Sequence, residues 1–120
     1  MKRVVLVSGS RDFPSKELVM DVMRKSFRAG DCLIYGCARG VDSWAEEAAR
    51  SVGVPVSRRP ADWDRYDKSA GMLRNSAMLH ETLAAPSYLI LYFWDGRSPG
   101  TKHMIDACQV RGATCSVVRS

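Results

Sequence analysis

SYLILYFW, residues 87–94, is the most apolar stretch of the chain and the one that decides the fold. Seven consecutive apolar residues begin at Tyr88, so a strand formed here has no polar face and must be buried on both sides. Such a strand lies at the centre of a sheet that is covered by other layers. The stretch is also much shorter than the roughly 20 residues needed to cross a bilayer, and we expect no membrane segment.

Strands and helices are predicted to alternate outward from this strand. Short apolar runs predict strands at 3–8, 32–35, 54–57 and 114–118, and helical spacing of apolar residues predicts helices at 15–28, 41–52, 71–83 and 99–110. Residues 58–69 show no period and are predicted to form a long loop. Repeated βαβ units with right-handed crossovers give a parallel sheet with helices on both faces. We therefore expect an α/β, Rossmann-like three-layer sandwich with a five-stranded parallel sheet in the order 3-2-1-4-5.

The composition limits the class of protein. A chain of 120 residues has room for one domain, here residues 1–120. Its 18 Lys and Arg against 13 Asp and Glu leave a net charge of +5, which favours an anionic partner. The four cysteines match neither a CxxC pair nor a zinc-ligand series, so no metal or cofactor is predicted. The apolar run at 4–7 is too short for a signal peptide, and we expect a cytoplasmic protein.

Four loops should meet at one edge of the sheet, at 9–12, 36–42, 62–75 and 95–101. In an open parallel sheet, ligands bind beyond the carboxyl ends of the strands, where the strand order reverses. Each loop contains an arginine, and three contain glycines that let backbone N–H groups approach an anion at a helix N-terminus. This convergence predicts a site for a phosphate-bearing ligand. The alternative is that the glycines serve tight turns and the arginines are solvated.

Several residues of these loops can be interpreted one by one. Arg74 lies near a helix start, where a positive charge opposes the helix dipole, and so indicates a nearby anion. Asp42, Ser98 and Thr101 lie where side-chain oxygens can satisfy the free N–H groups of a helix start. Trp63 could stack on a base, although a hydrophobic plug that pins the loop is the simpler interpretation. Neither G-x-G-x-x-G nor G-x-x-x-x-G-K-[ST] occurs, which disfavours dinucleotide dehydrogenases and P-loop NTPases.

Five motifs, in order, resemble one family. They are GSRDF at 9–13, GCARGVDSWAEEAA at 36–49, ADW at 61–63, AGMLRN at 70–75 and FWDGRSPGT at 93–101. Together they resemble the YspA-like family of the SLOG superfamily. These Rossmann-like domains are related to the Lonely Guy phosphoribohydrolases and to the DNA-processing protein DprA. The resemblance covers nearly the whole chain.

The resemblance implies a pocket for a nucleotide or a nucleotide-derived ligand. By position, Gly9, Ser10 and Arg11 would form its floor. One wall would consist of Gly36, Arg39, Gly40 and Asp42, and another of Arg74 and Asn75. The phosphate side would consist of Asp95, Gly96, Ser98, Gly100 and Thr101, and Trp63 would cover the base. The expected partner is thus a small molecule that the protein senses or sequesters in a bacterium or phage.

One departure from the related enzymes bears on catalysis. The Lonely Guy enzymes carry PGGxGTxxE, whose glutamate is needed to cleave the N-glycosidic bond, and Met104 stands at that position here. This argues against phosphoribohydrolase activity. Two alternatives stay open: a nucleotide-processing hydrolase in which Asp42, Asp62 or Asp95 replaces the glutamate, and nucleic-acid binding like that of DprA. A homo-oligomer is also compatible with the sequence.

Overall fold

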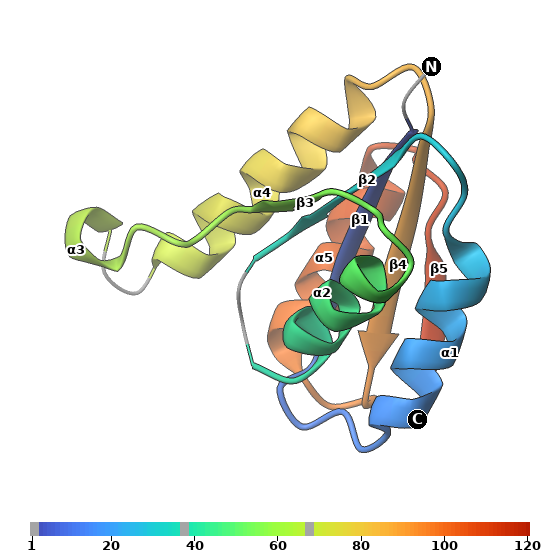
Figure 1. Cartoon of the computed structure of the whole chain (residues 1–120). Helices are drawn as coiled ribbons and strands as arrows, with labels where there is room; N and C mark the ends of the chain where they lie inside the picture. Colours follow the sequence, from blue (N-terminus) through green and yellow to red (C-terminus); the bar gives the residue numbers. More distant parts are fainter. Residues whose placement is uncertain (1–2, 37–38, 67–68) are drawn as a thin grey trace.

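Strands and helices alternate along the chain in the computed structural model, which describes residues 3–36, 39–66 and 69–120 apart from the side chains of Trp63 and Tyr66 (Figure 1). The strands are β1 (Arg3–Gly9), β2 (Asp31–Tyr35), β3 (Val56–Arg58), β4 (Tyr88–Trp94) and β5 (Ser116–Arg119). The helices are α1 (Lys16–Ser26), α2 (Val41–Ser51), α3 (Trp63–Tyr66), α4 (Ala70–Leu83) and α5 (Pro99–Val110). The α/β class predicted from the sequence is confirmed.

The strands form one parallel sheet in the order β3-β2-β1-β4-β5, as predicted. The chain moves outward from β1 to β3 and then returns to the other side of β1, so the order reverses between β1 and β4. The register pairs Gly9 with Phe93 and Tyr35 with Arg58. These pairs place the loops that follow β1, β2, β3 and β4 along one edge of the sheet.

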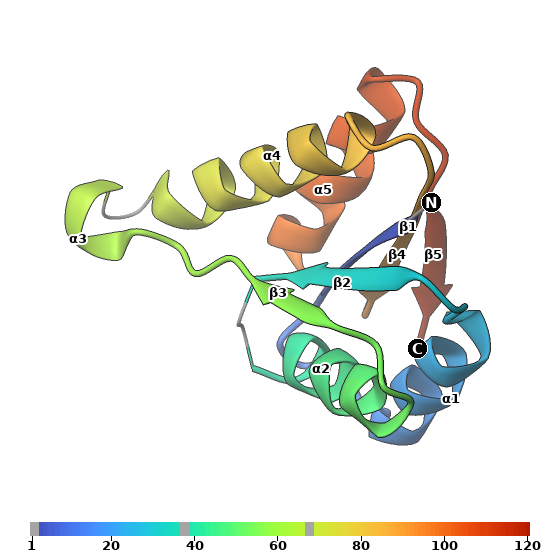
Figure 2. The same ribbon diagram turned by 45° about the horizontal axis from the view of Figure 1, so that its top comes forward.

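Two helical layers cover the sheet, α1 and α2 on one face and α4 and α5 on the other (Figure 2). Successive side chains of a strand point to opposite faces of the sheet, so each strand contributes to both layers. Leu91 and Phe93 of β4 pack with the α1 and α2 side, while Ile90 and Tyr92 pack with the α4 and α5 side. All four side chains are buried, which confirms that β4 is a central strand. None of the helices in the described ranges is long and apolar enough to cross a bilayer.

The segment predicted as one long loop contains a helix. The backbone N–H of Arg65 donates to Oδ1 of Asp62 at 3.2 Å, and this contact supports the first turn of α3. Four residues are too few to show a helical period, so the sequence pattern missed α3. The third strand also lies later than predicted, at Val56–Arg58, because only these residues pair with β2. Beyond β3, the chain and the start of α4 project away from the sheet (Figure 2).

Candidate functional site

A cleft of about 850 Å³ lies at the carboxyl edge of the sheet. The end of β1 and the loop after it, the β4–α5 loop, the start of α5 and residues of α2 and α4 line it. Nine of the residues predicted for the site lie on its walls: Gly9, Arg11, Asp42, Arg74, Asn75, Asp95, Ser98, Gly100 and Thr101. The cleft is where the strand order reverses, the place at which this kind of sheet binds ligands.

Ser10 joins the two central loops beneath the cleft. It is 1% exposed, and its backbone N–H donates to the Phe93 carbonyl at 2.9 Å. Its hydroxyl lies 3.2 Å from Oδ1 of Asp95 and 3.4 Å from Oγ1 of Thr101. The hydroxyl also accepts from the backbone N–H of Asp95 at 3.2 Å. Ser10, predicted as part of the floor, therefore lies beneath the cleft and holds the loop after β1 against the β4–α5 loop.

Asp95 holds the turn between β4 and α5. Its Oδ1 accepts from the backbone N–H groups of Ser98 and Arg97, both at 2.8 Å. These bonds from Ser98 and Arg97, with a smaller contribution from the Ser10 hydroxyl, hold the pKa of the Asp95 carboxyl below its ordinary value. A carboxylate held ionised in this way is poorly suited to donate a proton as a general acid.

The start of α5 lines the cleft, and one of its residues there is a glycine, Gly100. Ser98 is the N-cap, as predicted, and Pro99 occupies the first turn, where its missing N–H costs nothing. Gly100 follows in helical conformation, and a Cβ built on it would meet no atom within 4 Å. Its N–H has no hydrogen-bond partner among the described residues. The helix start therefore offers a donor and open space to a ligand in the cleft.

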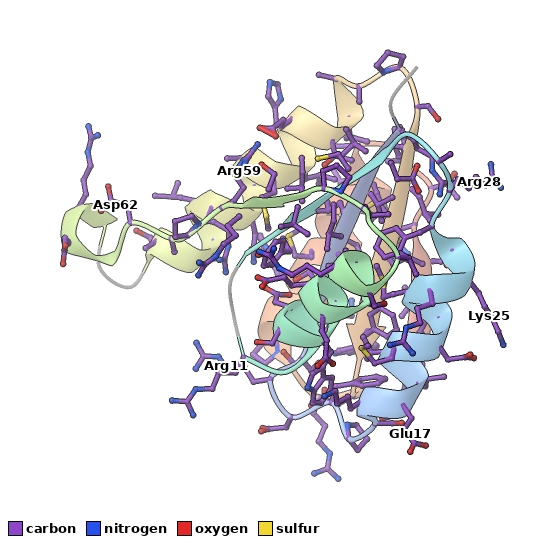
Figure 3. The ribbon with its side chains drawn as sticks, viewed as in Figure 1. Arg11, Glu17, Lys25, Arg28, Arg59 and Asp62 are labelled. Atoms are coloured by element: carbon purple, nitrogen blue, oxygen red, sulfur yellow. The ribbon has the colours of Figure 1, made fainter. Side chains whose placement is uncertain are left out.

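Two arginines on the cleft have no partner among the described residues. The Arg11 and Arg97 guanidinium groups are exposed and have no ion-pair or hydrogen-bond partner in the part of the chain that the structure describes. Figure 3 shows Arg11 projecting outward from the loop after β1. Arg39 is also exposed, but it is not among the residues that line the cleft.

Arg74 is anchored to the ends of two strands. Its Nη1 donates to the Gly36 carbonyl at the end of β2 and lies 3.4 Å from the Arg59 carbonyl beyond β3. Its Nε donates to Oδ1 of Asn75 at 2.8 Å. The other terminal nitrogen, Nη2, has no partner among the described residues. Arg74 therefore ties α4 to the sheet and keeps one nitrogen for a ligand.

Two predicted glycines and Asp42 shape the wall near α2. Asp42 is 4% exposed, and its Oδ2 accepts from the Gly36 N–H at 3.2 Å, so the carboxylate closes the turn before α2. A Cβ on Gly9 would lie 2.6 Å from Val41 side-chain atoms. The absence of a side chain at Gly9 lets α2 begin directly against β1.

The other predicted residues that the structure describes are not among those that line the cleft. Gly40 precedes α2 and has a φ of 74°. Gly96 has a φ of 83° and lies beside the Arg119 guanidinium. That guanidinium lies over the Trp94 ring, 5.0 Å from the ring centroid. Asp62 lines a neighbouring cavity. The Trp63 side chain lies outside what the structure describes. Met104, at the position of the Lonely Guy glutamate, is 1% exposed in the core beneath α5, so this position gives the cleft no functional group.

Three further cleft residues, Asp12, Arg97 and Pro99, lie in loops that the sequence predicted for the site, whereas Ser8, Pro14 and Ser120 were missed. Ser120 follows β5, and its place could have been inferred because every parallel strand ends at the same edge. Asp12 and Pro14 belong to the loop after β1, whose path depends on Phe13. That ring is 2% exposed and packs edge-on against Phe93 at 5.6 Å.

Comparison with known proteins places these features in a family. The family described as "YspA, cpYpsA-related SLOG family" matches residues 3–66, which include the β1 and β2 loops of the cleft. The Gene 61 protein of Mycobacterium phage D29 is 34% identical to this chain over 118 residues. The similarity covers 92% of this chain and 91% of that protein.

Proposed function

Because the chain belongs to the YspA, cpYpsA-related SLOG family, we propose that its cleft binds a nucleotide or a nucleotide-derived ligand, which the protein senses or sequesters. The phosphate contacts the start of α5, where Gly100 donates its N–H. The exposed guanidinium groups of Arg11 and Arg97 neutralise the phosphate charge, and Nη2 of Arg74 contacts the ligand on the α4 side.

The main support for the proposal is that the first turn of α5 contains a glycine, Gly100, whose Cβ position is open. A glycine within a helix costs about 1 kcal/mol relative to alanine. Nothing in the described structure requires glycine here, because its conformation is helical and a Cβ would have no neighbour. Residues that cost stability without a structural reason are expected at functional sites. The missing side chain leaves room for an oxyanion to approach the backbone.

Cleavage of the ligand has less support than binding. The Asp42 and Asp95 carboxylates accept backbone N–H bonds that shape turns, Asp62 lies on another cavity, and Met104 is in the core. The three aspartates therefore lack the arrangement expected of an acid and base pair around a scissile bond.

A thermal denaturation screen tests the proposal. Purified protein is heated with AMP, ADP-ribose, cyclic dinucleotides or adenosine, and the phosphate-bearing compounds are expected to stabilise it, by about 2.7 kcal/mol at a concentration of 100 Kd. The double variant Arg11→Ala/Arg97→Ala should lose this stabilisation. The control Arg28→Ala/Arg111→Ala removes the same charge from exposed residues that do not line the cleft.

Two results would contradict the proposal. One is the absence of stabilisation by any phosphate compound. The other is affinity for a single-stranded oligonucleotide that falls steeply with salt and is indifferent to the cleft variants, because that behaviour belongs to a nucleic-acid-binding protein.

A further inference from the structure

A cavity of about 540 Å³ lies at the edge of the sheet opposite the cleft. It lies between the turn that joins α1 to β2 and the turn that joins α2 to β3. We call it the amino-edge pocket and define it by Arg24, Phe27, Arg28, Val52, Val54 and Pro55. Figure 3 shows Arg28 near the start of β2 and Arg11, a residue of the cleft, at the other end of the sheet. Among the described residues, the pocket and the cleft share no lining residue.

Hydrogen bonds hold both turns that form the pocket. In the turn after α1, the backbone N–H of Asp31 donates to the Arg28 carbonyl at 3.1 Å, and the Arg28 N–H donates to Oδ2 of Asp31 at 2.8 Å. In the turn after α2, the Val54 N–H donates to the Ala49 carbonyl at 2.8 Å. The fold itself therefore forms the walls, as in most small-molecule sites.

The walls of the pocket are apolar. Phe27 and Val54 are partly buried and pack against the core between the sheet and the layer of α1 and α2. Val52 follows the last turn of α2 and is 47% exposed. An apolar group in the pocket would cover Val52 and extend the packing of Phe27 and Val54. Each methylene buried in this way favours binding.

The charged groups on the pocket favour a ligand with one negative charge. Arg24 and Arg28 are exposed, and within the described structure the Arg24 side chain makes one hydrogen bond, from Nε to the Ser51 hydroxyl at 3.2 Å. Asp31 also lines the pocket, but it is 3% exposed and both its carboxylate oxygens accept from Arg3. Two arginines against one aspartate leave a net charge of +1 on the lining residues.

The simplest explanation for these arginines is the helix dipole, and it covers only one of them. Phe27 is the C-cap of α1 and Val52 that of α2, so both helix ends bring partial negative charge to the pocket. Arg24 lies in the last turn of α1 and offsets this charge. Arg28 lies beyond the C-cap. Its guanidinium attracts the Asp31 carboxylate but forms no hydrogen bond or ion pair with any described residue, so its five N–H donors are available to a ligand.

We propose that the amino-edge pocket binds a small carboxylate with an apolar body, of the kind that a medium-chain fatty acid presents. The Arg28 guanidinium contacts the carboxylate, and the terminal nitrogens of Arg24 add a second cationic contact. The apolar body lies along Phe27, Val52 and Val54. This site is separate from the cleft and does not depend on the proposed function.

A series of ligands tests both halves of the site. Titration calorimetry of the full chain with octanoate is expected to show one site. Hexanoate and butanoate should bind progressively more weakly, by up to about fourfold for each methylene removed. Octylammonium has the same chain with the opposite charge, and its affinity should be at least about tenfold lower than that of octanoate.

Two pairs of matched variants locate the site. Arg28→Gln should weaken octanoate binding by about tenfold, because it removes a charged donor. Arg111→Gln removes the same charge from the C-cap of α5, away from the pocket, and should leave the affinity within about twofold. Val52→Asp should weaken binding by about tenfold, because it places a second negative charge beside the carboxylate. Val110→Asp changes an exposed valine at the end of α5 and is its control.

Three results would overturn the proposal. Butanoate binding as tight as that of octanoate would show that no apolar wall takes part. Octylammonium binding as tight as that of octanoate would mean that the arginines do not select the charge. Equal effects of Arg28→Gln and Arg111→Gln would leave the helix dipole as the whole explanation. The nucleotide screen of the cleft is a separate measurement, so neither result decides the other.

Discussion

The guanidinium group of Arg74 lies against Gly36 and donates to its carbonyl oxygen, so a side chain on Gly36 would occupy the same space. Gly36 is buried at the end of β2, while Arg74 comes from the first half of α4. The contact therefore fixes the distance between a helix and the sheet at the point where the cleft meets the neighbouring cavity on α4.

A double-mutant cycle tests this coupling. Arg74→Ala should lower the free energy of unfolding by about 1–3 kcal/mol, because the buried Gly36 carbonyl loses its charged donor. Gly36→Ala should destabilise the wild type by displacing the guanidinium, yet cost much less in the Arg74→Ala background. Urea unfolding of the four proteins measures the interaction energy. Additive effects would show that the two residues act independently.

Substitutions of Asp95 distinguish a role in holding the turn from a role in catalysis. Asp95→Asn keeps an oxygen that can accept from the Ser98 and Arg97 N–H groups, whereas Asp95→Ala removes it. We expect ADP-ribose affinity to change less than about threefold in Asp95→Asn and to fall about tenfold or more in Asp95→Ala. Release of a free base from the ligand by the wild type, abolished in Asp95→Asn, would instead assign Asp95 a catalytic role.

The fold could be predicted because its strongest signals are local. The apolar run of β4 identifies the central strand without any tertiary information, and the helices alternate with strands at regular spacing. Short elements lack such a signal. β3 is three residues long, and α3 depends on the contact between Asp62 and a single backbone N–H. The strand order was predicted correctly because topology limits the choices.

The candidate site was harder to predict because one residue type can serve two purposes. The placement of Arg74 against the helix dipole indicates an anion, but the structure also shows backbone carbonyls as its partners. These partners come from β2 and from beyond β3, and no pattern along the chain could reveal them. The neighbouring cavity was missed for the same reason, since its two sides, the segment at Arg59 and Pro60 and the helix α4, come from different parts of the sequence.

The ion pair between Arg3 and Asp31 should control acid stability. Burial alone would raise the pKa of the Asp31 carboxyl, but hydrogen bonds from Arg3 and the Arg28 N–H outweigh it and hold that pKa below its ordinary value. A lowered pKa contributes stability that is present above the unfolded value near 3.9 and is lost as the pH falls through the folded value. The loss should therefore begin below about pH 4.

Variants of this pair give the measurement. Arg3→Met leaves the carboxylate buried without its cation, which should cost about 3 kcal/mol at pH 7. Asp31→Asn should flatten the decline in the free energy of unfolding between about pH 4 and pH 2, as followed by urea titration at each pH. If Asp31→Asn kept the acid decline of the wild type, other carboxyls would be responsible for it.

Because the Tyr92 hydroxyl is buried, we expect its removal to be neutral or stabilising. It has no hydrogen-bond partner among the described residues, and burial beside Cys108 and Cys115 raises its pKa, so it stays protonated. Tyr92→Phe should leave the free energy of unfolding unchanged or raise it by about 1 kcal/mol, because an unsatisfied buried hydroxyl is removed without a cavity. Thermal unfolding measures this change. A loss above about 1 kcal/mol would mean that the hydroxyl has a partner.

Gly100→Ala separates stability from binding in a single substitution. The new Cβ has open space around it, and alanine favours the helix, so the free energy of unfolding should stay constant or rise by up to about 1 kcal/mol. The methyl group would also keep a phosphate from approaching the backbone, and ADP-ribose affinity should fall about tenfold. Gln109→Ala, exposed in the last turn of the same helix, is the control and should bind as the wild type does. Unchanged affinity in Gly100→Ala would remove the argument that the start of α5 holds the phosphate.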